Sequence, residues 1–225
     1  MRAWTAPPEG VGLEPEDVHV WRARLDVDPP TLARLAATLP LDEQSRAAAF
    51  RSARDAARFV AAHAGLRAVL ARYLRVPPRE IRFAVGPHGK PGLTGGADLT
   101  FNLSHADDLA LCVVARQRAV GVDVERVRDD LADTRVAARV LSGREAAVLA
   151  AASAGRRTAA FFDLWTRKEA YAKGLGTGLA VLEHVEVVPD PAGWMLVPLA
   201  PGPGFAAALA VEGGACRVSC WELVQ

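Results

Sequence analysis

Three acidic side chains on two separate stretches of the chain have the chemistry of a metal site. In residues 120–125, three valines alternate with Gly121, Asp123 and Glu125. At strand period the valines face one side and the two carboxylates face the other, roughly 6.5–7 Å apart. The third acid is Glu169, which shares one helical stripe with two aromatic residues and a lysine, namely Phe161, Trp165 and Lys173.

The aromatic residues place the stripe of Glu169 against the core, where a carboxylate is costly unless a cation or hydrogen bonds meet it. Asp123 and Glu125 are the acids best placed to share a cation with Glu169, because neighbouring carboxylates repel one another without one. Carboxylate oxygens are the ligands that Mg²⁺ prefers, and Lys173 adds a positive charge one turn further along. We therefore predict a magnesium site that handles phosphate groups.

Each part of this pattern also has a plainer interpretation. Two acids alternating on a strand are common on the wet face of a hairpin, and a Glu–Lys pair four residues apart is common on exposed helices. The Gly-Lys-Pro loop at residues 89–91 fits an ordinary turn, or a backbone that approaches phosphate with a lysine as a point charge. Arg46 and Arg58 fit solvated helix charges. Ser104 and His105 are neighbours on a strand, so they face opposite ways and do not form a hydrolase pair.

The composition is that of a folded protein without a large charge imbalance. The 225 residues are 51% hydrophobic and 24% charged with a formal net charge of +1, so they can form a sizeable core but have no positive surplus for nucleic acid. The first residues show no basic and apolar pattern typical of a signal peptide, and no apolar run approaches the ~20 residues of a membrane span. Cys112, Cys216 and Cys220 lack metal-ligand spacing and fit small core residues of a reducing compartment. We expect a cytoplasmic protein that binds neither nucleic acid nor membranes.

Hydrophobic periodicity predicts a strand, a group of helices, strands, and then helices and strands again. The predicted helices are a short one at 31–38, a long region at 42–75 broken near 52–54, one opened by a capping box at 142–145, and one at 158–174. The predicted strands are 18–25, 81–85, 99–105, 109–115, 120–125, 185–188, 194–199, 205–211 and 215–224. A short turn at 116–119 predicts a hairpin between two of these strands. The order predicts an α+β fold of two similarly built halves that meet near residues 116–120.

Three motifs together resemble a known family. Residues 102–105 (NLSH), 121–125 (GVDVE) and 165–173 (WTRKEAYAK) are similar, in order and spacing, to the signature motifs of the Sfp-type 4′-phosphopantetheinyl transferases. The resemblance extends upstream through residues 89–91 and the helix around Arg58, and covers roughly residues 40–180.

The resemblance implies a particular arrangement of the two halves. Each half would be a small, mostly antiparallel sheet packed with a long helix, and the halves would be pseudo-symmetric. They would divide as residues 1–117 and 118–225, with the active site in the cleft between them. Since one chain supplies both sides of that cleft, we expect a monomer.

The resemblance also implies a reaction. In that family a Mg²⁺ ion holds the pyrophosphate of coenzyme A while the phosphopantetheine arm moves to a serine hydroxyl of a carrier protein, releasing 3′,5′-ADP. By position, Asp123, Glu125 and Glu169 would be the ligands of Mg²⁺, or of Mn²⁺ in its place. Glu169, or a metal-bound water that it orients, would be the base, and Lys173 would contact the phosphates.

Other matching positions would bind coenzyme A itself. Arg58, Lys90 and His105 match residues that hold the 3′-phosphate and adenosine end, and the remaining contacts would come from Arg46, Gly89, Pro91 and Ser104. The family often carries a further lysine upstream, where this chain has Glu43. This substitution predicts weaker or rearranged contacts to the 3′-phosphate.

The implied partner is an acidic helical carrier domain of fatty-acid, polyketide or non-ribosomal peptide synthesis. Exposed basic residues could steer it electrostatically, namely Arg135, Arg139, Arg144, Arg156 and Arg157. Two other functions use the same residues: a Mg²⁺-dependent phosphohydrolase with water as nucleophile, and a coenzyme A binding module without catalysis.

Overall fold

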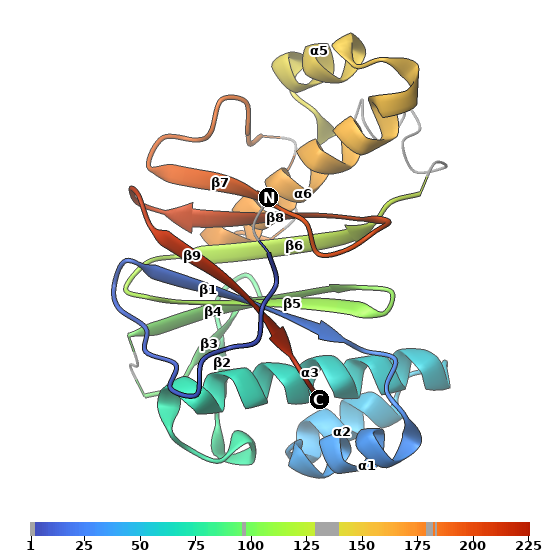
Figure 1. Cartoon of the computed structure of the whole chain (residues 1–225), viewed down its shortest axis with the longest axis vertical. Helices are drawn as coiled ribbons and strands as arrows, with labels where there is room; N and C mark the ends of the chain where they lie inside the picture. Colours follow the sequence, from blue (N-terminus) through green and yellow to red (C-terminus); the bar gives the residue numbers. More distant parts are fainter. Residues whose placement is uncertain (1–2, 96–97, 129–139, 179–181, 183) are drawn as a thin grey trace.

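Two β-sheets pack face to face in the computed structural model, which describes residues 3–95, 98–128, 140–178, 182 and 184–225 (Figure 1). The first sheet has the order β4-β5-β1-β9, with β1 (Asp17–Arg24), β4 (Leu99–Ala106), β5 (Leu109–Arg116) and β9 (Arg217–Leu223). The second has the order β6-β8-β7, with β6 (Val120–Arg126), β7 (Trp194–Leu199) and β8 (Phe205–Glu212). All neighbouring pairs are antiparallel except β1 and β9.

Helices cover the outer face of each sheet (Figure 1). Against the first sheet lies α3 (Ala53–Leu74), with α1 (Pro29–Thr38) and α2 (Leu41–Ala48) packed on it. Against the second lies α6 (Arg157–Leu175), which also contacts α5 (Gly143–Ala151). Short 3₁₀ turns stand at η1 (Pro78–Glu80) and η3 (Ala154–Arg156). The predicted α+β fold, with a long helix on each small sheet, is confirmed.

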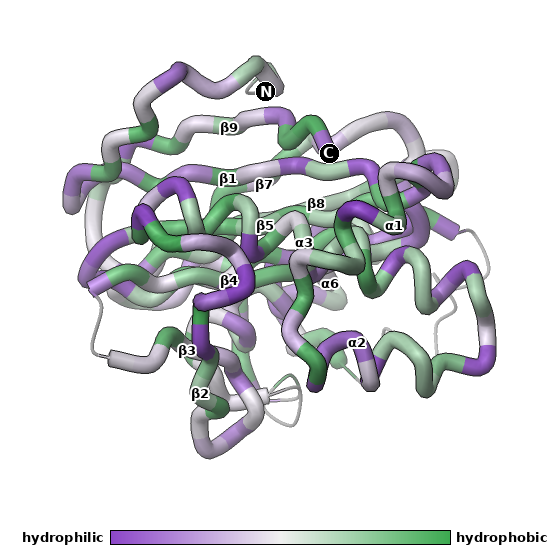
Figure 2. The backbone as a smooth tube through the Cα atoms, turned by 90° about the horizontal axis from the view of Figure 1, so that it is seen from below, coloured by the Kyte–Doolittle hydropathy of each residue, from purple (hydrophilic) through white to green (hydrophobic). Residues whose placement is uncertain are grey.

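A separate hairpin leaves this body between η1 and β4. It consists of β2 (Phe83–Val85) and β3 (Pro91–Leu93), which pair only with each other among the described strands. Figure 2 shows the hairpin projecting away from the two sheets. Its connecting loop therefore carries residues 86–90 beyond the first sheet.

Local capping explains where the helices begin and end. The hydroxyl of Ser52 accepts the backbone N–H of Asp55 and separates α2 from α3, as the predicted break requires. The predicted capping box of α5 is present, with Ser142 and Glu145 bonded reciprocally. Helix α6 ends one residue later than predicted, at Leu175, and its C-cap is Gly176, whose φ of 70° allows the left-handed cap.

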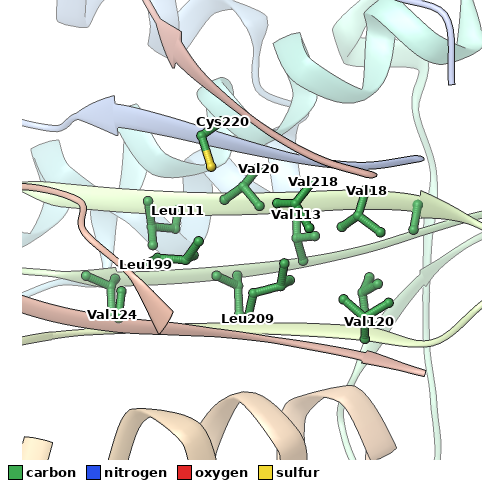
Figure 3. Close-up of a cluster of buried hydrophobic side chains, with 14 of the residues drawn as sticks. Val18, Val20, Leu111, Val113, Val120, Val124, Leu199, Leu209, Val218 and Cys220 are labelled. Carbon is green, nitrogen blue, oxygen red and sulfur yellow. The ribbon is translucent and has the colours of Figure 1, made fainter. Parts of the chain in front are cut away.

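The main core lies between the two sheets. Val18 and Val20 of β1 face Val120, Val122 and Val124 of β6, and all five are 0–1% exposed (Figure 3). A fully buried valine contributes about 1.5–3 kcal/mol, so this valine face fixes the rotation of β6. Because side chains alternate along a strand, the acids of β6 are turned the other way, toward α6.

Two predictions about the strands are wrong. The strands at 109–115 and 120–125 do not form a hairpin, because both edges of β5 are occupied by β4 and β1, while β6 pairs with β8. Residues 185–188, predicted as a strand, have no strand structure. The last strand, β9, joins the first sheet beside β1, so residues 217–223 lie in the sheet of the N-terminal half.

No helix in the described ranges is both long enough and apolar enough to cross a membrane.

Replacing Gly121 with alanine should lower the free energy of unfolding by about 3 kcal/mol or more. Overpacking a core usually costs about 1–3 kcal/mol, and the upper end applies here because the neighbouring atoms are rigid. An added Cβ would lie 2.0 Å from the carbonyl oxygen of Ala170 and 2.4 Å from the nitrogen of Gly174, both backbone atoms of α6. Urea unfolding measures the loss. Gly214→Ala is the control, because its Cβ would meet nothing within 4 Å. Equal stability of the two variants would contradict this account of the close packing of β6 and α6.

Candidate active site

The edge strands of the two sheets, β4 and β6, lie side by side and are joined by side chains. The Oδ1 of Asn102 accepts the backbone N–H of Val122 at 2.9 Å, and the Oγ of Ser104 donates to the Oδ1 of Asp123 at 2.9 Å. Each bond crosses from the first sheet to the second. The NLSH motif of β4 therefore fixes the position of the acidic strand.

Asp123 is the most deeply buried of the three predicted acids, at 1% exposure. Its Oδ1 accepts hydrogen bonds from Ser104 and, at 2.5 Å, from the ammonium of Lys173. Its Oδ2 is buried and has no hydrogen-bond partner among the described residues. A buried carboxylate oxygen without a partner is costly, so this atom is suited to a further cation.

Glu169 and Lys173 face Asp123 from α6. The Nζ of Lys173 lies 3.5 Å from the Oε2 of Glu169. Burial and the charge of Asp123 raise the pKa of Glu169 to about 7, against the opposing effect of Lys173. Although burial lowers the pKa of Lys173, the charges of Asp123 and Glu169 outweigh it and raise that pKa. The lysine is therefore charged while Glu169 is close to half protonated at neutral pH.

Glu125 stands two residues along β6 from Asp123. The indole Nε1 of Trp165 donates to its Oε1 at 3.3 Å. Burial and the charge of Asp123 raise the pKa of Glu125. Burial is thus the largest cause of the raised pKa of both glutamates, and the negative charge of Asp123 adds to it.

The donor chemistry of these acids fits a magnesium ion. Three carboxylates supply oxygen ligands of the kind that Mg²⁺ prefers, and the Oδ2 of Asp123 is available. Among the described residues no three His, Cys, Asp or Glu side chains form a ready-made metal cluster. The counter-charge within the chain comes from Lys173, which bonds Asp123 directly.

A cavity of about 390 Å³ opens beside Glu169 and Lys173. Its wall comes from both halves: Asn102 and residues 88–91 on one side, and α6 with the loop after it on the other. The predicted loop at residues 89–91 therefore lines the same hollow as the predicted base. This cavity is large enough for part of a nucleotide-sized ligand.

Lys90 is placed differently from the other predicted cations. Its ammonium donates to the carbonyl oxygens of Val120 at 3.1 Å and Gly174 at 2.8 Å. Its side chain lines the cavity, but its charge is directed at these two backbone oxygens.

The predicted cations Arg58 and His105 lie near the other end of the site. Arg58 forms a two-pronged ion pair with Asp26, at 2.7 and 3.0 Å. Loss of hydration lowers the pKa of His105, and the charges of His63, Lys173 and Arg58 lower it further. The charges of Arg58 and Lys173 thus both reach His105, and its lowered pKa leaves the imidazole uncharged at neutral pH.

Arg46 and Glu43 lie on α2, which packs on α3. The guanidinium of Arg46 lies 5.1 Å from the ring centre of Phe59, and the residue is exposed. Glu43 points inward, where it is 4% exposed and pairs with Arg67 at 2.7 Å and His63 at 3.1 Å. Burial opposes its ionisation, but His63 and Arg67 lower the pKa of Glu43 to about 2. Glu43 is therefore part of the α2–α3 contact and does not face the cavity.

One important pair escaped the sequence analysis. Lys168 and Glu145 are both 0% exposed and bonded at 2.8 Å. Glu145 also accepts the backbone N–H groups of Ser142 and Val187, each at 2.7 Å. The pair ties α5 and the segment near Val187 to α6, one residue before Glu169. Lys168 shares a helix face with the buried Leu164 four residues earlier, which is the signal that it points inward.

Of the arginines expected to steer a partner, Arg144, Arg156 and Arg157 are exposed on α5 and at the start of α6. Arg135 and Arg139 lie outside the described residues.

Family models match both halves of the chain. Residues 26–117 match the N-terminal region of 4′-phosphopantetheinyl transferases, and residues 119–209 match the 4′-phosphopantetheinyl transferase superfamily.

Individual proteins similar to this chain are also 4′-phosphopantetheinyl transferases. The 4′-phosphopantetheinyl transferase HetI of Nostoc sp. is 36% identical over 234 residues, which cover 99% of each chain. The 4′-phosphopantetheinyl transferase Sfp of Bacillus subtilis is 28% identical over 140 residues, 62% of this chain and 61% of that one. The 4′-phosphopantetheinyl transferase AcpT of Salmonella typhimurium is 36% identical over 110 residues, 49% of this chain and 56% of that one.

Proposed function

The chain is an enzyme of the 4′-phosphopantetheinyl transferase superfamily, and we propose that it moves the phosphopantetheine arm of coenzyme A to a serine of an apo carrier protein in a Mg²⁺-dependent reaction. The observation that carries this proposal is the meeting of Ser104, Asp123, Glu169 and Lys173 from two sheets and one helix. The unpartnered Oδ2 of Asp123 supports the metal requirement. Mn²⁺ is an alternative metal with the same preference for oxygen.

The acids of β6 and α6 would hold the metal. Mg²⁺ bound by Asp123, Glu125 and Glu169 would neutralise the pyrophosphate of coenzyme A and stabilise the charge on the departing phosphate. Lys173, charged and buried beside Asp123, would hold the same phosphates in position.

Glu169 would accept the proton of the attacking serine. The serine oxygen forms a bond to the phosphorus that carries the pantetheine arm, and the bond from that phosphorus to the bridging pyrophosphate oxygen breaks. The products are the phosphopantetheinyl serine and 3′,5′-ADP. Without metal the pKa of Glu169 is about 7, and a bound Mg²⁺ would lower it and keep the side chain ionised, as a proton acceptor must be.

The N-terminal half would hold the nucleotide end. Arg58 and Lys173 both lie close enough to His105 to lower its pKa, and Arg46 is exposed on the neighbouring helix. We assign the 3′-phosphate to these side chains and to Ser104. Gly89 and Pro91 would contact the nucleotide through the wall of the cavity. Glu43 would take no part, because Arg67 and His63 hold it inside.

The direct test is incubation with coenzyme A, Mg²⁺ and a panel of apo carrier proteins of the fatty-acid, polyketide and non-ribosomal peptide types. The mass of a carrier should rise by one phosphopantetheine group, and 3′,5′-ADP should appear in equal amount. A phosphohydrolase would cleave coenzyme A without changing the carrier mass, and a binding module would do neither. Chelating the metal should stop the transfer.

Magnesium should stabilise the folded protein more at about pH 8 than at about pH 6. The pKa of Glu169 is raised from its ordinary value near 4.5 to about 7, so without metal its ionisation weakens the fold as the pH rises through this range. Bound Mg²⁺ relieves that repulsion when Glu169 is ionised, but must displace a proton at low pH. Thermal unfolding with and without Mg²⁺ measures the difference. In Glu169→Gln, Mg²⁺ should raise the unfolding temperature by the same amount at both pH values. If Mg²⁺ raises the unfolding temperature of the unmodified protein equally at both pH values, the prediction is wrong.

A further inference from the structure

Lys90 joins the two halves of the molecule through its ammonium group. It lies at the end of the loop between β2 and β3, and its Nζ reaches the carbonyl oxygens of Val120, at the start of β6, and Gly174, in the last turn of α6. The last carbonyls of a helix have no partner within the helix and carry partial negative charge. An ammonium is therefore a suitable cap for them, and here it comes from the other half.

The stem of Lys90 is also held in place. A Cβ added at Gly176, the C-cap of α6, would lie 3.1 Å from the Cδ of Lys90. The loop that carries Lys90 thus packs directly on the end of the helix. Burial lowers the pKa of Lys90, in keeping with an ammonium turned away from water.

Lys90 also separates two hollows. On one side is the 390 Å³ cavity with Glu169 and Lys173, and on the other is a hollow of about 630 Å³ with walls from Phe101, Arg118 and Leu175. Both hollows share Lys90, Pro91 and Gly176 as a common wall. The position of the Lys90 side chain therefore decides the shape of the catalytic cavity.

We propose that Lys90 is a positioning residue that fastens the β2–β3 loop to the end of α6, and that it does not bind the 3′-phosphate of coenzyme A. This inference rests on the proposed transfer reaction. We call the two contacts of Lys90 with the carbonyl oxygens of Val120 and Gly174 the Lys90 clamp. Because Lys173 immediately precedes Gly174, the clamp keeps Lys173 at a fixed distance from the β2–β3 loop. Both donor contacts of Lys90 are to backbone, so its charge is already satisfied in the structure.

A clamp on α6 and a contact to the 3′-phosphate are alternative roles for Lys90, and 3′-dephospho-coenzyme A distinguishes them. In Lys90→Met the clamp predicts that kcat falls roughly 10–100-fold, the effect of losing hydrogen bonds from a charged donor. The preference for coenzyme A over its 3′-dephospho form should stay unchanged, because no contact to the 3′-phosphate is lost. A phosphate contact predicts instead that kcat is kept and that this preference disappears, which would overturn the proposal. Lys90→Arg should restore much of kcat, because a guanidinium can also donate to two carbonyls.

Hydrogen–deuterium exchange tests the clamp without turnover. Backbone amides of residues 172–178 should exchange faster in Lys90→Met, while α3 keeps its protection. Arg82→Met is the control, because Arg82 is exposed at the base of the same hairpin and lines neither hollow. If the unmodified chain transfers nothing, the proposed function fails and exchange alone decides the clamp. If it transfers normally and Lys90→Met behaves like Arg82→Met in both assays, the clamp is wrong.

Discussion

Replacing Glu169 with glutamine is expected to lower the rate of phosphopantetheine transfer by about 10²–10⁴-fold, the usual contribution of a general base, with a further loss from the missing metal ligand. Glutamine keeps the shape of the side chain but cannot accept the serine proton or supply a charged oxygen. Coenzyme A should still bind in the presence of metal, because the side chains of Arg58 and Lys173 are unchanged. Initial rates by mass spectrometry and coenzyme A binding by calorimetry measure the two effects separately.

The control for Glu169→Gln lies on the same helix. Asp163 is exposed on α6, so Asp163→Asn removes one negative charge without entering the site. It should transfer at the normal rate. Turnover of Glu169→Gln within a few fold of this control would exclude Glu169 both as base and as essential ligand. A variant that fails to bind coenzyme A as well would show that Glu169 acts in binding and not in the chemical step.

Replacing Glu145 with glutamine is expected to reduce the free energy of unfolding by about 3–5 kcal/mol, the cost of leaving a buried charge without its partner. Lys168 is 0% exposed, and its ammonium donates hydrogen bonds to Glu145 and to the carbonyl oxygen of Val185. Without the carboxylate, the ammonium must be buried among neutral acceptors alone or lose its proton. Urea unfolding followed by circular dichroism measures the loss.

A double-mutant cycle separates the ion pair from simple packing. Lys168→Met combined with Glu145→Gln should be less destabilised than the sum of the single changes, because the double variant leaves no unpaired charge. Arg217→Met breaks a pair with Asp17 at the surface, where Arg217 is 67% exposed, and should change stability very little. Additive single effects in the cycle would contradict a coupled pair. The single variants should also transfer slowly, since the pair holds α6 next to Glu169.

The local elements could be predicted because each follows from a short-range period. The alternating valines of β6, the break at Ser52 and the capping box at Ser142 are all confirmed by the structure. The meeting of Asp123 with Glu169 and Lys173 could also be anticipated, since the aromatic stripe forces Glu169 inward and leaves it in need of charged neighbours.

Pairing between distant elements could not be predicted in the same way. A short turn after β5 is compatible with a hairpin, but the turn does not reveal that β4 and β1 already occupy both edges of β5. Likewise, Lys168 lies within a motif of exposed and buried residues, and its partner Glu145 is 23 residues away in the sequence. Glu43 was interpreted through the resemblance as a missing cation, whereas its partners Arg67 and His63 give it a structural role.

The parallel pairing of β9 with β1 affects how the polypeptide reaches its final shape. A ribosome releases β1 about two hundred residues before β9, since Asp17 pairs with Arg217. Until the last strand emerges, one edge of β1 is left with unsatisfied amides and with Val18 and Val20 on an apolar face. The nascent protein therefore exposes an unpaired strand edge for most of its synthesis, and the first sheet is completed only when the final strand has emerged.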